Sequence, residues 1–164
     1  LDLATLEGGG GEIDVEEVPV SWLFERVAER HGVATSQRRI TLTTRIEPGA
    51  EHVMADGRRL EQALQNLVAN AVRHTPDDGR IVVSAARVGG RIRLRVDDSG
   101  PGIPAEHLAL VFDRFYKIDQ SRAAFGGSGL GLSIVKAIVE RHGGKVTASN
   151  ADGGGARFDL LLPA

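Results

Sequence analysis

The segment 56–74 carries polar side chains in a pattern that could bind a cation. Its apolar residues recur every three or four positions, which predicts a helix with Asp56 as its N-cap. At about 100° per residue, Asn66, Asn70 and Arg73 group on the face opposite the apolar one. An amide oxygen on a rigid helix can ligate a hard cation such as Mg²⁺. An ordinary solvated helix face would explain the same residues, so the pattern alone leaves both interpretations open.

A second signal is a carboxylate that falls in phase with buried side chains. The predicted strand 91–97 alternates arginine with apolar residues, and Asp98 takes the next apolar position. A carboxylate in a buried layer is costly unless it is paired. Gly100 and Gly102 follow, and residues without a Cβ let a flat ligand approach the backbone. Asp98 therefore either opens a turn or accepts a hydrogen bond from a ligand such as the exocyclic amine of adenine.

A third signal is the alternation of glycines in segment 126–132, directly before an amphipathic pattern. Backbone N–H groups and the positive end of a helix would form an anion site there. The spacing matches neither GxxxxGK[ST] nor GxGxxG, and a glycine-rich loop is often only a turn. Taken together, however, the three signals supply a cation ligand, an amine acceptor and an anion cradle. Those are the separate requirements of Mg²⁺, adenine and polyphosphate.

The elements that must position these residues alternate between helices and strands. We expect helices over 21–37, 56–74, 105–111 and 130–142, and strands over 13–18, 40–46, 52–55, 81–88, 91–97, 145–149 and 156–162. The segment 113–127 lacks periodicity and is expected to be a long functional loop. This order indicates an α/β two-layer sandwich, with one sheet covered on one face by helices.

Composition narrows the possible function further. The 164 residues carry a net charge of −2, which argues against bulk electrostatic binding to nucleic acid or to an anionic membrane. The absence of cysteine excludes disulfides, thiolate zinc sites and cysteine nucleophiles. No apolar run approaches the length of a membrane span. The missing initiator methionine suggests a piece of a longer protein, in which residues 1–11 would be a linker or the end of a preceding helix and 12–164 one domain.

Four segments resemble the sequence boxes of the catalytic, ATP-binding domain of bacterial sensor histidine kinases, which has the Bergerat fold. They are an N box at 64–71, a first glycine box at 98–104, an F box at 111–117 and a second glycine box at 127–132. The resemblance spans Ile13 to Pro163. It implies a mixed, mostly antiparallel sheet covered on one face by about three helices, with ATP and Mg²⁺ as ligands.

The resemblance also implies roles for the residues that would act on the metal and the phosphates. Asn70 would ligate Mg²⁺ through its amide oxygen, and Asn66 would support the metal or its waters. Arg73 occupies the position of a basic residue that contacts phosphate. Lys117 and Arg122 lie on the side of the loop that is expected to contact phosphate.

Further residues would enclose the base and cradle the phosphates. The resemblance places Asp98 on the adenine amine and His74 along the adenine ring. Phe112 and Phe115 are expected to anchor the base of the loop by packing. The remaining members of the implied nucleotide site are Gly100, Gly102, Ile103, Gly127, Ser128, Gly129, Leu130, Gly131 and Leu132.

The acceptor of the phosphoryl group would be a histidine on a separate dimerisation domain. None of the five histidines, His31, His52, His74, His107 and His142, precedes the acidic residue and proline typical of an acceptor helix. We therefore expect this chain to bind ATP without phosphorylating itself. The full protein would be a membrane-bound homodimer with this part in the cytoplasm, and it would act on a response regulator and bind no nucleic acid.

Three alternatives remain open from the sequence. Gyrase-type, chaperone and mismatch-repair ATPases share the implied fold, but they carry a water-activating glutamate where Asn66 stands. Serine kinases of the anti-sigma type usually carry that glutamate too. A module that binds nucleotide and signals its occupancy without chemistry is the third possibility.

Overall fold

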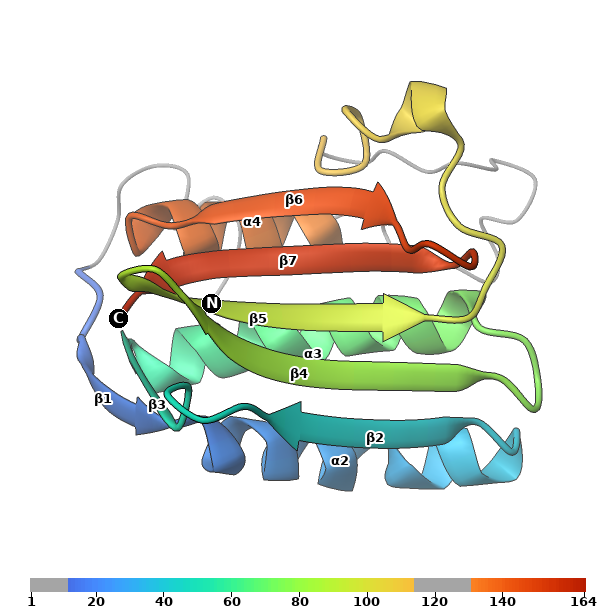
Figure 1. Cartoon of the computed structure of the whole chain (residues 1–164), viewed down its shortest axis with the longest axis horizontal. Helices are drawn as coiled ribbons and strands as arrows, with labels where there is room; N and C mark the ends of the chain where they lie inside the picture. Colours follow the sequence, from blue (N-terminus) through green and yellow to red (C-terminus); the bar gives the residue numbers. More distant parts are fainter. Residues whose placement is uncertain (1–11, 114–130) are drawn as a thin grey trace.

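The computed structural model describes residues 12–113 and 131–164. Figure 1 shows how the elements follow one another along the chain. The helices are α2 (Val20–Gln37), α3 (Gly57–His74), the single 3₁₀ turn η1 (Ala105–His107) and α4 (Gly131–Arg141). The strands are β1 (Glu16–Pro19), β2 (Thr41–Ile46), β3 (His52–Ala55), β4 (Arg80–Val88), β5 (Arg91–Asp98), β6 (Lys145–Asn150) and β7 (Ala156–Pro163).

The strands form one large sheet and one small one. The large sheet has the order β2-β4-β5-β7-β6, in which β2 and β4 are parallel and every other neighbouring pair is antiparallel. The connection from β2 to β4 passes through β3 and α3, the kind of crossover that a parallel pair requires. β3 pairs with β1 in the small sheet. The predicted mixed, mostly antiparallel sheet is therefore confirmed.

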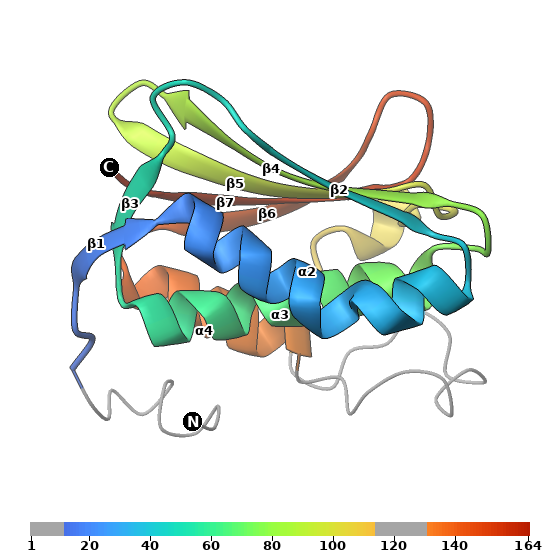
Figure 2. The same ribbon diagram turned by 90° about the horizontal axis from the view of Figure 1, so that it is seen from below.

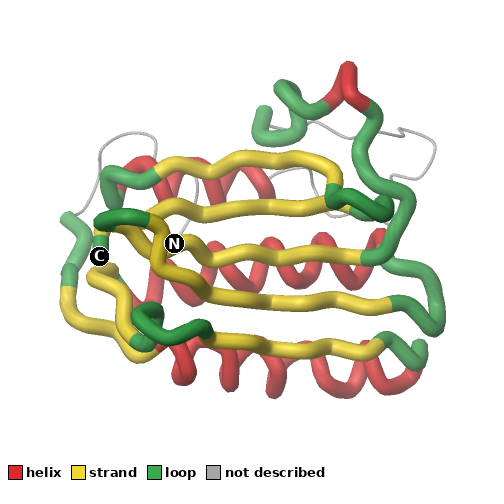
Figure 3. Tube along the Cα trace, in the orientation of Figure 1, coloured by secondary structure: helices red, strands yellow, loops and turns green. Residues whose placement is uncertain are grey.

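All three helices lie on one face of the large sheet (Figures 2 and 3). Between the two layers lies a single core of buried apolar side chains from both. In α3 the predicted apolar face is buried completely or nearly so, at Leu60, Leu64, Leu67 and Ala71. The predicted N-cap is confirmed as well, because the Asp56 side chain accepts a hydrogen bond from the Arg59 N–H.

The alternation along β5 decides which side chains reach the core. Ile92, Leu94 and Val96 are at most 1% exposed, and Asp98 continues this inward set at 7% exposed. The other face of the sheet carries charges that pair across strands. Arg95 contacts Asp159 and Arg157 contacts Asp97, each at 2.6 Å from Nε to a carboxylate oxygen.

Two predicted elements differ from the structure by more than one residue at an end. The first strand covers Glu16–Pro19 and not 13–18, since only these residues pair with β3. The predicted helix 105–111 is wrong: a single 3₁₀ turn is followed by turns with hydrogen bonds from Leu110 N–H to His107 O and from Asp113 N–H to Leu110 O. Val111 is buried there and Leu108 packs against the core, whereas Leu110 is exposed. Most of the predicted loop 113–127 lies outside the described residues.

Candidate functional site

The candidate site is centred on Asp98 at the end of β5. Its Oδ1 accepts hydrogen bonds from the backbone N–H of Gly100 at 2.8 Å and of Ala156 at 3.1 Å. Burial raises the pKa of Asp98 above the ordinary value of an aspartate, although the two N–H donors and His74 lower it. A carboxylate offers about four acceptor positions, so two hydrogen bonds leave capacity for a ligand donor.

At Gly100 the backbone that follows β5 lies close to the end of α3. A Cβ at this position would lie 2.5 Å from the carbonyl oxygen of His74 and 3.1 Å from Oδ1 of Asp98. No larger residue fits without a shift of the backbone, so glycine is required here for close approach. Through this contact the structure brings together three of the residues that the sequence indicated: His74, Asp98 and Gly100.

Gly102 and Ile103 are held by Asn150 from the end of β6. The Asn150 side chain accepts a hydrogen bond from Ile103 N–H at 2.7 Å and donates one to Ile103 O at 2.8 Å. Gly102 has φ +82°, and a Cβ there would lie 2.7 Å from Asn150 Oδ1. Sequence reasoning missed Asn150, whose partner lies 47 residues earlier in the chain. Its only signal was a polar side chain between a strand and a turn.

Gly155 is a second residue that sequence reasoning missed. It has φ +90°, and a Cβ there would lie 1.9 Å from the carbonyl oxygen of Asp98. From the sequence, this glycine lies only between the predicted strands 145–149 and 156–162. The structure shows that Gly155 lets the start of β7 close onto Asp98, where Ala156 donates its N–H to the carboxylate.

The polar face of α3 is less exposed than its spacing indicated. Asn70 is only 8% exposed, because α3 packs against α2, α4 and β5 and its buried arc is wide. Asn66 is half-buried, and its Nδ2 donates to the carbonyl oxygen of Gly131 at 3.5 Å. The prediction that Asn70 lies opposite the buried face is therefore wrong, while Arg73 and His74 are exposed.

Side chains in the last turn of α3 form hydrogen bonds with one another and with the backbone of that turn. His74 Nδ1 bonds to the carbonyl oxygen of Asn70 at 2.8 Å, and Arg73 Nη2 donates to Asn70 Oδ1 at 3.5 Å. The amide oxygen that was predicted to ligate Mg²⁺ therefore contacts a guanidinium in this structure. A contact of 3.5 Å is weak, so a cation could displace it.

The remaining predicted site residues divide into those that the structure describes and those that it does not. Phe112 packs edge-on against Phe158, with ring centroids 6.0 Å apart, which agrees with the packing role expected for it. Leu132 packs against the core, and Gly131 opens α4. The predicted residues that lie outside the described ranges are Phe115, Lys117, Arg122, Gly127, Ser128, Gly129 and Leu130.

The oxygen ligands that this site offers suit Mg²⁺ better than a metal ion coordinated by protein side chains alone. Within the described residues no three or more histidine, cysteine, aspartate or glutamate side chains gather in a way that could hold a metal. Mg²⁺ usually keeps several waters and binds through one or two protein oxygens plus phosphates of a substrate. A single amide oxygen at Asn70, whose side chain is nearly buried, fits that mode.

A five-stranded mixed sheet covered on one face by three helices, with an inward aspartate that has no ion-pair partner among the described residues, is the architecture of the Bergerat fold. The sequence model of the histidine kinase-, DNA gyrase B- and HSP90-like ATPases matches residues 55–164, and the chain belongs to this family. Its similarity to curated proteins points to the sensor kinase branch.

Several curated relatives match nearly the whole chain, among them two sensor proteins. The sensor protein DivL of Caulobacter vibrioides is 40% identical over 163 residues, which are 99% of this chain and 20% of DivL. The sensor-like histidine kinase SenX3 of Mycolicibacterium smegmatis is 34% identical over 164 residues, which are 99% of this chain and 42% of SenX3. The chain thus spans less than half the length of either relative. It is similar to the ATPase domain of sensor histidine kinases.

Solved structures agree with this assignment. The catalytic domain of the histidine kinase ThkA superposes with a TM-score of 0.81 at 29% identity, covering 92% of this chain and 96% of that domain. Full-length ShkA in complex with AMPPNP gives a TM-score of 0.84 at 31% identity, covering 98% of this chain and 33% of ShkA.

Among residues 12–113 and 131–164, no helix is both long and apolar enough to cross a bilayer.

Proposed function

We propose that this chain binds Mg-ATP and donates its γ-phosphate to a histidine on a separate dimerisation domain of the same sensor kinase. The observation that carries the proposal is the buried Asp98 carboxylate, which is held against the end of α3 through Gly100 and has acceptor capacity to spare. The solved structure of full-length ShkA is a complex with AMPPNP, an ATP analogue, which supports a nucleotide as the ligand.

Base recognition would rest on Asp98, His74 and the backbone that Asn150 holds. The carboxylate would accept a hydrogen bond from the exocyclic amine of adenine, a donor that guanine lacks at the corresponding position. Gly100 and Gly102 would let the ring approach the backbone, and Ile103, which is buried, would supply an apolar surface. His74 would line the ring from the end of α3.

Asn70 would hold Mg²⁺ through its amide oxygen, with Asn66 one turn earlier supporting the metal or its waters. When bound, the metal neutralises charge on the phosphates and orients them. Arg73 would leave Asn70 Oδ1, which it contacts at 3.5 Å, and turn its guanidinium toward phosphate. Lys117, Arg122 and the glycine-rich segment 127–132 would complete the phosphate site.

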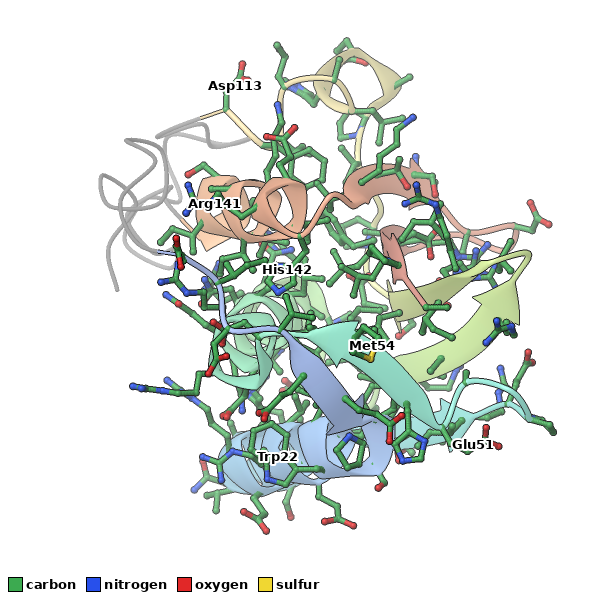
Figure 4. All side chains as sticks on the ribbon, turned by 90° about the vertical axis from the view of Figure 1, so that its left-hand side faces the viewer. Trp22, Glu51, Met54, Asp113, Arg141 and His142 are labelled. Carbon is green, nitrogen blue, oxygen red and sulfur yellow. The ribbon has the colours of Figure 1, made fainter. Side chains whose placement is uncertain are left out.

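Phosphoryl transfer would then depend on positioning and charge, since the reaction asks little covalent chemistry of the protein. Two histidines of this chain are poor acceptors because their rings are engaged in the interior. His142 lies in the interior of the domain (Figure 4). Its Nδ1 bonds to Ile138 O, and its Nε2 accepts from Asp56 N–H. His31 bonds through Nε2 to Gln65. An amide at Asn66 cannot accept a proton from water, which disfavours hydrolysis.

The wider setting follows from the same proposal. Residues 12–164 would be the ATP-binding domain, preceded by a linker at 1–11. The whole protein would be a homodimer that is anchored in the membrane, with this domain in the cytoplasm and a response regulator as its partner. The structure of ThkA with the response regulator TrrA supports the class of partner.

Calorimetry with Mg-AMPPNP tests the proposal directly. We expect the parent chain to bind, Asn70→Ala to lose the dependence of affinity on Mg²⁺, and Asp98→Asn to lose the preference for adenine over guanine nucleotides. Asp97→Asn is the matched control, since Asp97 points to the other face of the sheet and pairs with Arg157. A parent chain that binds no nucleotide would refute the proposal.

The transfer step needs the upstream domain. Joined to its dimerisation domain, the chain should phosphorylate that domain from labelled ATP, and alone it should not become labelled. Steady ATP turnover by the isolated chain would favour the ATPase alternative. Binding without any transfer in the joined protein would favour a module that only senses nucleotide.

A further inference from the structure

The Arg38 side chain donates hydrogen bonds to the C-terminal end of α3, although it lies in a distant part of the chain. It follows α2 directly, and its two Nη atoms donate to the carbonyl oxygens of Val72 and Thr75. Its Nε donates to Asp77 Oδ1 at 2.9 Å. The backbone adds a fourth contact, from Asp78 N–H to Arg38 O at 3.0 Å. One planar guanidinium thus spans the last turn of α3 and the residues just beyond it.

These contacts complete the hydrogen bonding of a helix end. The last carbonyl groups of an α-helix have no partner within the helix, and a cation is favoured beside them. In α3 the carbonyl of Asn70 bonds to the His74 ring, and that of Ala71 accepts from Thr75 N–H. Arg38 takes the carbonyl of Val72, so the end of α3 is fixed from 34 residues away in sequence.

The turn that Arg38 holds is the one that carries the proposed site. Asn70 and His74 lie in it, and the carbonyl of His74 is where Gly100 makes its closest approach. We propose that Arg38 is a positioning residue for nucleotide binding: it fixes the last turn of α3, and with it Asn70 and His74, relative to Asp98. This inference rests on the proposed function, because it assumes that Asn70 and Asp98 bind the same nucleotide.

A neighbouring arginine provides a matched control. Arg39 forms an ion pair with Asp78, at 2.7 Å from Nε to Oδ1, and both side chains are about two-thirds exposed, at 67% and 66%. Within the described residues, the hydrogen bonds of its side chain go to Asp78 and not to α3. Arg39→Gln therefore removes the same charge one residue away without releasing the end of the helix.

The test compares Arg38→Gln, Arg38→Lys and Arg39→Gln with the parent chain. The dissociation constant for AMPPNP is measured by calorimetry with and without Mg²⁺, well below the unfolding temperature of each variant. We expect Arg38→Gln to weaken Mg-AMPPNP binding about tenfold, the worth of a charged hydrogen bond. Arg38→Lys should be nearly as weak, because an ammonium cannot reproduce the planar fork. Arg39→Gln should stay within about twofold of the parent.

The magnesium dependence separates positioning from stability. If Arg38 places Asn70, Arg38→Gln should reduce the gain in affinity that Mg²⁺ gives, as Asn70→Ala does. Equal affinities in Arg38→Gln and Arg39→Gln would overturn the inference, and so would an equal loss with and without Mg²⁺. A parent chain that fails to bind AMPPNP would instead refute the proposed function.

Discussion

Two buried aspartates lie at opposite ends of α3. They have similar exposure and accept the same number of backbone hydrogen bonds, but their pKa values shift in opposite directions. Asp56 is 8% exposed and Asp98 is 7% exposed, and each carboxylate accepts two backbone N–H groups. Asp56 also contacts Arg59, at 3.4 Å. Among the described residues, Asp98 forms no ion pair with lysine or arginine. One difference between the two carboxylates is therefore that only Asp56 has an arginine partner.

That difference appears in the direction of each pKa shift. Burial raises the pKa of Asp56, but the N–H donors of Asp14 and Arg59 and the Arg59 charge outweigh it, so the net shift is downward. Burial dominates at Asp98, and its pKa is raised. A carboxylate whose charge is balanced by hydrogen bonds and a cation stabilises the fold. A buried carboxylate without a counter-ion is typical of a site that binds a ligand. We infer that the Asp56 end of α3 serves stability and the Asp98 end serves binding.

The largest expected effect is on nucleotide affinity at the Asp98 end. Asp98→Asn keeps the shape of the side chain but replaces a charged acceptor with an amide. A hydrogen bond to a charged group is worth about 1.5–3 kcal/mol, so AMPPNP affinity should fall about 10- to 100-fold. The free energy of unfolding should not fall, since a buried unpaired charge has been removed. Calorimetry and urea denaturation measure the two quantities.

The next effect is on stability at the Asp56 end. Asp56→Ala removes the N-cap of α3 and leaves Arg59, which is mostly buried, without its partner. The free energy of unfolding should fall by about 2 kcal/mol, the upper range for loss of a cap. Affinity for AMPPNP, measured where the variant is folded, should be unchanged. A large loss of affinity in this variant would contradict the division between the two ends.

A smaller effect is expected at Asn150, on the Asp98 side of the molecule. Asn150→Asp keeps the acceptor for Ile103 N–H but places an oxygen where Nδ2 donates to Ile103 O. Loss of one hydrogen bond, about 1 kcal/mol, should weaken AMPPNP binding about fivefold. Thr147→Asp, an exposed position on the same strand, is the control. An unchanged affinity in Asn150→Asp would show that Gly102 and Ile103 need no such support.

The smallest effect is a difference in pH dependence between the two aspartates. The folded-state pKa of Asp56 is lowered, so its stabilisation is present above about pH 4 and is lost as pH falls through the folded pKa. The folded-state pKa of Asp98 is raised, so its ionisation destabilises the fold as pH rises from about 4 through the folded pKa. Denaturation of Asp56→Asn, Asp98→Asn and the parent from pH 3 to 7 should therefore give difference curves of opposite slope. Slopes of the same sign would contradict the comparison.

Much of the framework could be predicted because its signals are local. The apolar spacing of α3 and the alternation along β5 fix which side chains face the core, and that phase alone placed Asp98 inward. The spacing of residues along α3 did not predict that Asn70 is buried, because its burial depends on how α2 and α4 pack around α3. Local spacing also failed at 105–111, where a 3₁₀ turn and further hydrogen-bonded turns take the place of the predicted helix.

The contacts that shape the site were beyond sequence reasoning, since each joins segments that are far apart. Arg38 reaches Val72 and Thr75, Asn150 reaches Ile103, and Gly155 lies against Asp98. No spacing or composition in one sequence reports such pairs. Residue types marked the groups that would touch the ligand, whereas the groups that hold them in place emerged only with the fold.

The most direct test of the account is the structure of the chain with Mg-AMPPNP bound. We expect the adenine amine within hydrogen-bonding distance of the Asp98 carboxylate, and the Asn70 amide oxygen on Mg²⁺ in place of its contact with Arg73. Nucleotide bound elsewhere, or adenine turned away from Asp98, would contradict the central claim.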